Sequence, residues 1–250
     1  MADDQIKTAL ISVYDKTGIV DFSKILSAAG IRIVSTSKTA DMLRSSGIVV
    51  TDASRFTGFP EILGGRVKTL HPKIAAGILA RADNQNDDAE LSKNRIERIG
   101  LVVVNFYPFE KIAADPDSAL DEAVENVDIG GPAMLRAAAK NFSRVAAVCD
   151  PGDYPKIAEE LSRAKRISIE SRRKLAAKAF EYVAAHDAAI SSFLHVKFLP
   201  YELFPQKLPL SYSKVQDLRY GENPHQKAAL YKAADGEGAV LSQRRQLWGK

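Results

Sequence analysis

The segment Gly64–Pro72 holds a dense group of side chains that could do chemistry. Arg66, Lys68, Thr69 and His71 follow a pair of glycines there. Two cations and a hydroxyl can bind a phosphate group, and glycines allow backbone N–H groups to come close to such a ligand. The alternative is a solvated basic loop that leads into a helix, and the segment alone does not decide between the two.

Short apolar runs alternate with helical patterns on both sides of this segment. Buried strands are predicted over residues 8–13, 31–34, 48–50, 101–106 and 145–149. Later helices with one apolar face are predicted over 133–140, 154–163 and 169–196. Strands that alternate with helices over short connections predict an α/β fold with a doubly wound, mostly parallel sheet.

Four polar stretches lie at the predicted carboxyl ends of these strands. They are residues 12–17, 35–39, 66–71 and 105–107. Ligands of an open parallel sheet bind in the crevice outside the carboxyl ends of its strands. We therefore expect the side chains of the four stretches to form one site.

The composition limits the kinds of function that are possible. The chain has 250 residues and a net charge of +4, which is too small to indicate nucleic-acid binding. Its single cysteine excludes an internal disulfide, and no run of about 18 apolar residues could span a membrane. No cluster of His and Cys has the spacing of metal ligands. We expect a cytoplasmic protein, and the charge supports at most a weak attraction for anionic metabolites.

The character of the sequence changes at Pro200, where three prolines fall within ten residues. Helical periodicity stops there, so residues 198–216 are predicted to be a linker. Residues 1–197 would form the first domain. The last stretch, 217–250, is too short to bury a core by itself and is expected to be the beginning of a second domain.

Five motifs cover much of the chain: SVYDKTG from Ser12, TGFPEILGGRVKTLHPKI from Thr57, NFYPF from Asn105, DIGGPAMLRAAAKN from Asp128 and RYGENPHQ from Arg219. In this order they resemble the bifunctional AICAR transformylase/IMP cyclohydrolases. The resemblance implies that the first four belong to a cyclohydrolase domain with a methylglyoxal-synthase-like fold. That domain closes the purine ring of the formylated ribotide FAICAR to give IMP, with loss of water, in the last step of de novo purine biosynthesis.

The resemblance also implies a role for individual residues. The catalytic residues would be Lys140, as the main acid/base group, with Asp128, Lys68 and Tyr107. The ribose, 5′-phosphate and base would be bound by Ser12, Lys16, Ser35, Thr36, Thr39, Arg66, Thr69, Asn105 and Ile129. No cofactor is implied for the cyclisation.

Several of these residues have simpler interpretations when they are taken one at a time. Asp128 could cap a helix, Lys140 could complement the end of one, and Tyr107 could be a core aromatic residue. We expect His71 to fix a loop and His186 to be packed on a helix face. The resemblance favours function for the first three and leaves the two histidines unchanged.

One stretch departs from the family pattern. The family usually has a glycine pair after Ser35-Thr36, and this chain has Ser37 and Lys38 instead. Side chains at these positions remove the easy access to positive φ that glycine provides. Lys38 could offer its charge to the phosphate, or the affinity for substrate could be reduced.

The fifth motif implies a second activity. Arg219, Tyr220 and His225 match the family's AICAR-binding residues, but the catalytic Lys–His pair and the folate-binding part have no counterpart before Lys250. We expect formyl transfer from 10-formyltetrahydrofolate, and a homodimer, only in a full-length protein. Two alternatives remain: a nucleotide-sensing domain of the same fold, and a lyase acting on a triose phosphate, which the NFYPF and RYGENPHQ motifs do not suit.

Overall fold

The computed structural model describes residues 5–113, 119–164 and 166–233. The chain divides into two compact units. The first comprises Met1–Tyr107 and Asp128–Val183, and the second comprises Pro108–Val127 and Ala184–Lys250. This division differs from the predicted first domain, 1–197, because the long helix α10 (Ile169–Phe198) belongs partly to each unit.

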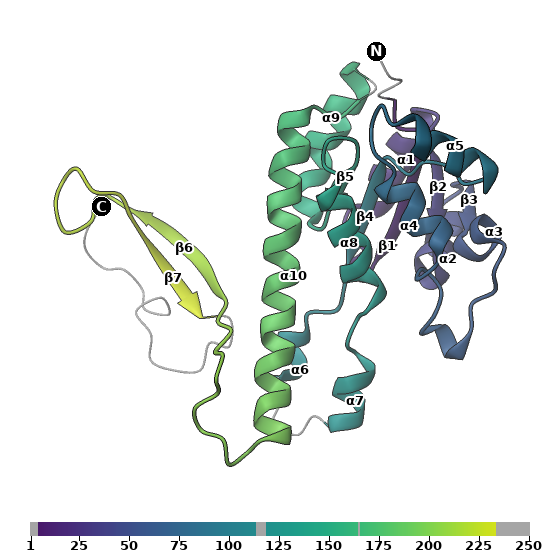
Figure 1. Cartoon of the computed structure of the whole chain (residues 1–250). Coiled ribbons are helices and arrows are strands. Elements are labelled where there is room, and N and C mark those ends of the chain that lie inside the picture. Colours follow the sequence, from purple (N-terminus) through teal and green to yellow (C-terminus); the bar gives the residue numbers. More distant parts are fainter. Residues whose placement is uncertain (1–4, 114–118, 165, 234–250) are drawn as a thin grey trace. The chain divides into compact units, whose positions relative to one another are not determined.

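The first unit is built on a sheet of five parallel strands in the order β3-β2-β1-β4-β5 (Figure 1). The strands are β1 (Thr8–Val13), β2 (Arg32–Ser35), β3 (Val50–Asp52), β4 (Leu101–Asn105) and β5 (Ala146–Val148). The chain first winds outward from β1 to β3 and then returns to place β4 on the other side of β1. The predicted parallel sheet is confirmed, and its strand order reverses between β1 and β4.

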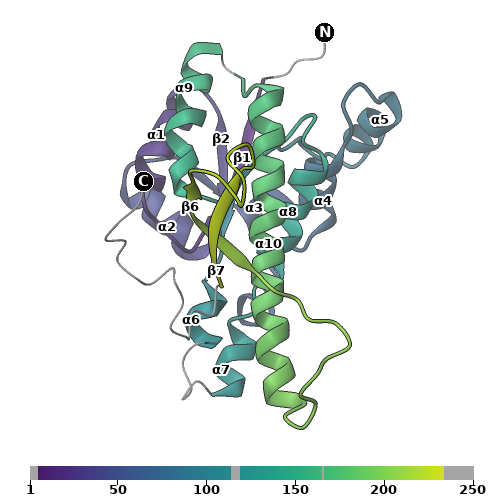
Figure 2. The same cartoon turned by 90° about the vertical axis from the view of Figure 1, so that its left-hand side faces the viewer.

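Helices cover both faces of this sheet (Figure 2). On one face lie α1 (Ile19–Ala28), α2 (Ser37–Ser45) and α9 (Tyr154–Ala164). On the other lie α3 (Ala53–Thr57), α4 (Pro72–Leu79), α8 (Gly130–Lys140) and the first part of α10. Alternate residues of β1 enter different cores: Ile11 belongs to one and Leu10 to the other. Apolar runs without alternation are expected where both faces of a strand are buried.

Two helices of the first unit differ from the sequence prediction. No helix is predicted from the sequence over α5 (Gln85–Lys93), because this helix buries only Leu91 and so has little apolar periodicity. It begins at Asn84, whose side chain accepts a hydrogen bond from Asp87 N. α2 begins at Ser37, so the predicted polar turn 35–39 includes the first turn of this helix.

The second unit contains α6 (Phe109–Ala113), α7 (Leu120–Glu125), the end of α10 and an antiparallel pair, β6 (Tyr212–Leu218) and β7 (Ala228–Ala233). His186 is buried beside the ring of Phe109, as the packed-histidine prediction requires. Strand β6 overlaps the end of the predicted linker, 198–216. Residues 212–216 are therefore part of a strand and not of a linker. All residues of β6 are exposed, which explains why they carry no apolar signal.

Part of the predicted second domain, residues 234–250, lies outside the described residues. Within the described ranges, no helix combines the length and the apolar character needed to cross a membrane.

Candidate active site

Three hydrogen bonds made by hydroxyl groups tie the carboxyl end of β1 to the segment around the start of α2. Ser35 Oγ donates to Ile11 O at 2.7 Å, and Thr39 Oγ1 donates to Val13 O at 3.1 Å. The hydroxyls of Ser12 and Thr36 share a hydrogen bond of 3.0 Å. Ser35 and Thr39 therefore hold the helix start in place, and the first backbone N–H groups of α2 are available for an anion.

Two lysines add positive charge at this edge. Burial, followed by repulsion from the ammonium group of Lys38, lowers the pKa of Lys16 from its ordinary value. The Lys16 Nζ donates to the carbonyl oxygens of Val13 and Tyr14, which directs it back over the end of β1. Two like charges close together at a helix start form a field that favours a bound anion.

Ser37 has a backbone conformation that usually favours glycine. Its φ is +40°, in the left-handed region, although it carries a side chain. Its hydroxyl donates to Glu61 Oε2 at 3.2 Å, in the loop that follows α3. Ser37 therefore has a conformation that a glycine at this position would adopt readily. Glu61, which the sequence did not single out, joins the turn to the next loop.

The glycine pair of the loop makes a tight reversal. Gly64 and Gly65 have φ values of +64° and +93°, and an antiparallel bridge joins Ile62 to Val67 around them. A Cβ on Gly65 would lie 2.6 Å from a carboxylate oxygen of Glu61 and 3.7 Å from Lys68 Nζ. Gly65 therefore makes room for these two charged side chains, and Arg66 follows it as an exposed residue.

The end of this loop leads into α4. His71 caps the helix, because its Nδ1 accepts a hydrogen bond from Lys73 N at 3.1 Å. The loop-fixing role predicted for His71 is confirmed. Thr69 is buried, and its Oγ1 lies 2.6 Å from the position that a Cβ on Gly130 would occupy. The loop that contains the glycine pair is thus in contact with the start of α8.

Asn105 ends β4 and fixes the turn after β1. Its Oδ1 accepts hydrogen bonds from Tyr14 N at 2.7 Å and Asp15 N at 2.8 Å, and its Nδ2 donates to Asp15 O at 3.2 Å. The side chain was predicted to contact a base, and the structure uses it to hold the turn that precedes Lys16. The ring of Tyr14 then meets the ring of Tyr107 edge-on, with centroids 4.8 Å apart.

The start of α8 brings a carboxylate to the same edge. Asp128 Oδ1 accepts a hydrogen bond from Gly131 N at 2.7 Å, so the capping interpretation is correct in geometry. A Cβ on Gly131 would lie 2.9 Å from both Asp128 Oδ2 and the ring of Phe106. Asp128 therefore lies beside the residue that precedes Tyr107, while Ile129 is 61% exposed.

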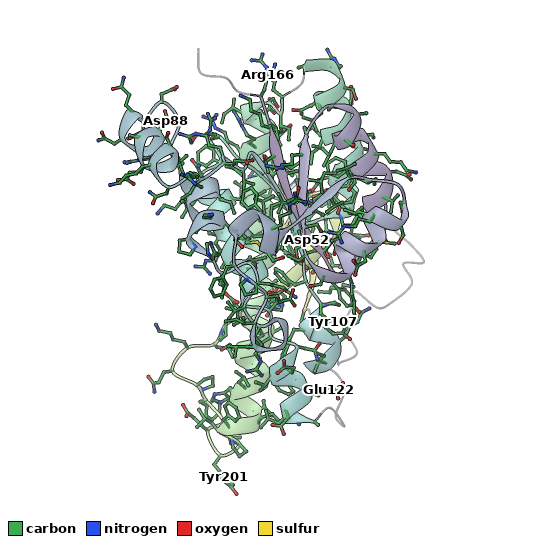
Figure 3. The ribbon with its side chains drawn as sticks, turned by 90° about the vertical axis from the view of Figure 1, so that its right-hand side faces the viewer. Asp52, Asp88, Tyr107, Glu122, Arg166 and Tyr201 are labelled. Carbon is green, nitrogen blue, oxygen red and sulfur yellow. The ribbon has the colours of Figure 1, made fainter. Side chains whose placement is uncertain are left out.

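These contacts join the ends of β1 and β4, the glycine loop and the start of α8 into one edge. The predicted residues that they place there are Ser12, Lys16, Ser35, Thr36, Thr39, Lys68, Thr69, Asn105, Tyr107 and Asp128. Figure 3 shows Tyr107 at the opposite end of the first unit from Arg166. The edge combines a helix start and lysines with one carboxylate and one phenol, which suits acid/base chemistry on a phosphorylated substrate.

Lys140 does not join this edge within one chain. It ends α8, which begins at Gly130, and ten residue steps of a helix span about 15 Å. There it lines a cavity of about 620 Å³ together with Arg136, Arg173 and Phe180. The predicted acid/base role of Lys140 therefore has no support from the arrangement of the first unit.

The residues of the fifth motif lie in the second unit. Arg219 lies over the ring of Tyr220, with 5.9 Å between the guanidinium carbon and the ring centroid, and both are exposed, as is His225. Within the described ranges, no group of three or more His, Cys, Asp or Glu residues could hold a metal ion.

Comparison with known proteins agrees with the fold and the motifs. Residues 18–133 match the model of the MGS-like domain, and residues 138–250 match that of the AICARFT/IMPCHase bienzyme. The crystal structure of ForH aligns with a TM-score of 0.68 and 37% identity, over 76% of this chain and 99% of that chain. The first unit is therefore an MGS-like domain.

The relatives identify the family. The bifunctional purine biosynthesis protein PurH of Acetivibrio thermocellus is 48% identical over 245 residues, which are 98% of this chain and 48% of that protein. PurH of Persephonella marina is 49% identical over 245 residues, 98% of this chain and 47% of that protein. The chain belongs to the AICARFT/IMPCHase bienzyme family, and it spans about half the length of these curated relatives.

Proposed function

We propose that the first unit is an IMP cyclohydrolase, which closes the ring of FAICAR to IMP. The carboxamide nitrogen attacks the formyl carbon, and a new C–N bond forms. Each of the two nitrogens then gives up one proton, and the formyl oxygen leaves with both as water. The reaction needs an anchor for the 5′-phosphate, a base for a weak amide nucleophile and a donor to the developing oxyanion.

The observation that supports this proposal most is the convergence of unlike groups at the strand-order reversal. Asp128 comes from the start of α8, Tyr107 from the end of β4 and Lys68 from the glycine loop. Asp128 lies beside Phe106, and Thr69, next to Lys68, contacts the same helix start through Gly130. These contacts link three segments that are far apart in sequence.

Each of these groups suits one part of the reaction. The carboxylate of Asp128 would orient the carboxamide and accept its proton. The Tyr107 hydroxyl and the Lys68 ammonium would donate to the formyl oxygen as negative charge develops there. We assign no part in this reaction to Lys140 within one chain, because of its place at the far end of α8.

The 5′-phosphate would bind at the start of α2. Lys16 and Lys38 bring two positive charges there, and Arg66 and Thr69 belong to the neighbouring loop. Backbone N–H groups at a helix start are suited to such a ligand. The hydroxyls of Ser12 and Thr36 lie beside it and could contact the ribose or the phosphate.

The test is cyclisation of FAICAR by the purified chain, with IMP formation monitored by absorbance. We expect the chain to form IMP at a rate well above the spontaneous one. This rate should fall about 100-fold in Lys68→Met and should stay unchanged in Lys24→Met, a substitution on the surface of α1. A chain that binds IMP but forms none would favour the alternative, a nucleotide-sensing domain. The left-handed φ of Ser37 is compatible with the glycine that the family usually has there, so this turn does not by itself favour that alternative.

The full-length protein would also formylate AICAR with 10-formyltetrahydrofolate as co-substrate. Arg219, Tyr220 and His225 would contribute to AICAR binding in that case, in a cytoplasmic homodimer. We expect the 250-residue chain to lack this activity. Formyl transfer by the purified chain in an assay with 10-formyltetrahydrofolate would contradict the expectation.

A further inference from the structure

The end of β4 is followed by a residue whose backbone is held by a single side chain. Phe106 N donates to the hydroxyl oxygen of Tyr182 at 3.3 Å. The same hydroxyl donates to Phe106 O at 3.2 Å. Tyr182 lies on α10, 76 positions further along the chain, so nothing local in the sequence indicates this contact.

The ring of Phe106 is held as firmly as its backbone. It stacks on the ring of Tyr182, with centroids 4.5 Å apart and planes inclined by 26°. On the α8 side, Gly131 approaches so closely that a Cβ there would be 2.9 Å from the Phe106 ring. Phe106 is 4% exposed and is therefore fixed between α8 and α10.

The backbone that leads to Tyr107 depends on this arrangement. The last strand pair between β1 and β4 joins Val13 to Asn105, so the ladder stops one residue before Phe106. The carbonyl of Phe106 belongs to the peptide group that connects it to Tyr107. The Tyr182 hydroxyl holds one end of that planar peptide group, which includes the N and Cα atoms of Tyr107. It therefore helps to fix the point from which the Tyr107 side chain leaves the backbone.

We propose that Tyr182 is a positioning residue for the Tyr107 hydroxyl during ring closure. The proposal rests on the proposed function, in which Tyr107 donates to the formyl oxygen. Stabilisation of an oxyanion depends on the donor lying at the right place before the reaction begins. Tyr182 touches no reacting atom, and its effect passes through Phe106 to Tyr107.

Tyr154 provides a matched control. It stacks on Phe22 with centroids 4.6 Å apart, and it is 5% exposed. Its buried hydroxyl has no hydrogen-bond partner among the described residues. Tyr154→Phe therefore removes the same atom from a similarly stacked tyrosine that holds no backbone group.

The experiment is a double-mutant cycle on FAICAR cyclisation by the purified chain, with kcat, KM and the thermal midpoint measured for each variant. We expect Tyr182→Phe to lower kcat about tenfold and to leave KM unchanged, because the phosphate is bound elsewhere. In a Tyr107→Phe background, Tyr182→Phe should have no further effect on kcat. Tyr154→Phe should behave as the unmodified chain.

Three results would overturn the inference: an unchanged kcat in Tyr182→Phe, the same loss in both backgrounds, or an equal loss in Tyr154→Phe. If Tyr107→Phe alone has no effect, the role given to Tyr107 fails first. If the chain forms no IMP, the proposed function fails, and crystal structures of the chain and of Tyr182→Phe decide the positioning role. A Tyr107 ring that keeps its contact with Tyr14 in the variant would refute it.

Discussion

The two ends of α8 belong to one sequence motif but make different kinds of contact. At its start, Asp128 accepts the hydrogen bond of Gly131 N, and Gly130 and Gly131 admit Thr69 and Phe106 at short range. At its end, Asn141 Nδ2 donates to Ile78 O at 2.7 Å and to Ala80 O at 3.0 Å. The first end meets loops and a strand end, whereas the second meets the end of another helix.

The difference teaches that residues in one motif need not share one site. A helix of eleven residues separates its two ends by more than a lysine side chain can reach. Glycines at the start of α8 permit close approach to the candidate site, while Asn141 at its end satisfies carbonyl groups that α4 leaves without a partner inside the helix. The motif therefore combines one end at the candidate site with one structural end.

The largest effect should come from the charge at the start of the helix. Asp128→Asn retains an oxygen that can accept from Gly131 N but removes the negative charge. We expect kcat for IMP formation to fall about 100-fold with little change in the thermal midpoint. Asp41→Asn, an exposed carboxylate on α2, is the control. A variant with full activity would show that Asp128 only caps α8.

The next largest effect is expected at the end of α8, where a substitution of Asn141 should change the stability of the protein and not its activity. Asn141→Ala removes the amide that donates to the carbonyls of Ile78 and Ala80, and among the described residues only the Ala80 carbonyl keeps a second donor, Arg98 Nη1. We expect the free energy of unfolding to fall by about 2 kcal/mol, measured by urea denaturation. The folded fraction should keep its kcat, and a large loss of kcat in folded protein would contradict a purely structural role.

A smaller effect is expected for the positive charge that faces the start of α2. Lys38→Met removes the repulsion that helps to lower the pKa of Lys16, so that pKa should rise toward 10.5. IMP affinity should be about threefold weaker near neutral pH. As pH rises, binding to the unmodified chain should weaken first, since its Lys16 loses its proton at lower pH. Calorimetry between about pH 7 and about pH 10 tests this, with Lys24→Met as the control.

The sign of the linked stability follows from the same shift. The folded chain holds the Lys16 proton less tightly than the unfolded chain, so the unfolded state binds more protons below 10.5. The free energy of unfolding should therefore rise as pH increases through the lowered pKa, and Lys38→Met should reduce this rise. An equal rise in both proteins would mean that Lys38 does not affect Lys16.

The smallest effect is expected at Lys140. Lys140→Met should leave kcat and KM within about twofold of the unmodified chain, because a cation at a helix end contributes mainly a small electrostatic stabilisation. The same FAICAR assay measures it. A loss comparable to that of Asp128→Asn would break the comparison between the two ends and would restore Lys140 to the reaction.

The sheet and its functional edge were accessible from the sequence because buried parallel strands are continuous apolar runs. LVVVNF predicted β4 to within one residue. The ligand crevice predicted from the polar residues after the strands stays a prediction. α5 was missed because only Leu91 is buried in it, and β6 was missed because every one of its residues is exposed. Elements without an apolar pattern leave no periodic signal.

Site residues divide in the same way. Lys16, Lys68, Tyr107 and Asp128 could be selected by type and motif, since each can do chemistry alone. Glu61 and Tyr182 could not, because their roles arise from contacts with residues 24 and 76 positions away. Sequence spacing also could not predict the hydrogen-bond partners of the Asn105 side chain, whose amide oxygen accepts from the backbone N–H groups of Tyr14 and Asp15.

The neighbouring position of β1 and β4 has a consequence for how the chain acquires its shape. The Asn105 side chain must find a partner 91 positions earlier, and the pairing of Ala9 with Leu101 closes a loop of similar length. Contacts of such high sequence separation form slowly, since the entropy of the intervening chain is lost before they are gained. We expect the candidate site to be among the last parts to assemble during folding. A ribosome-bound chain that ends before β4 would carry the glycine loop without a complete candidate site.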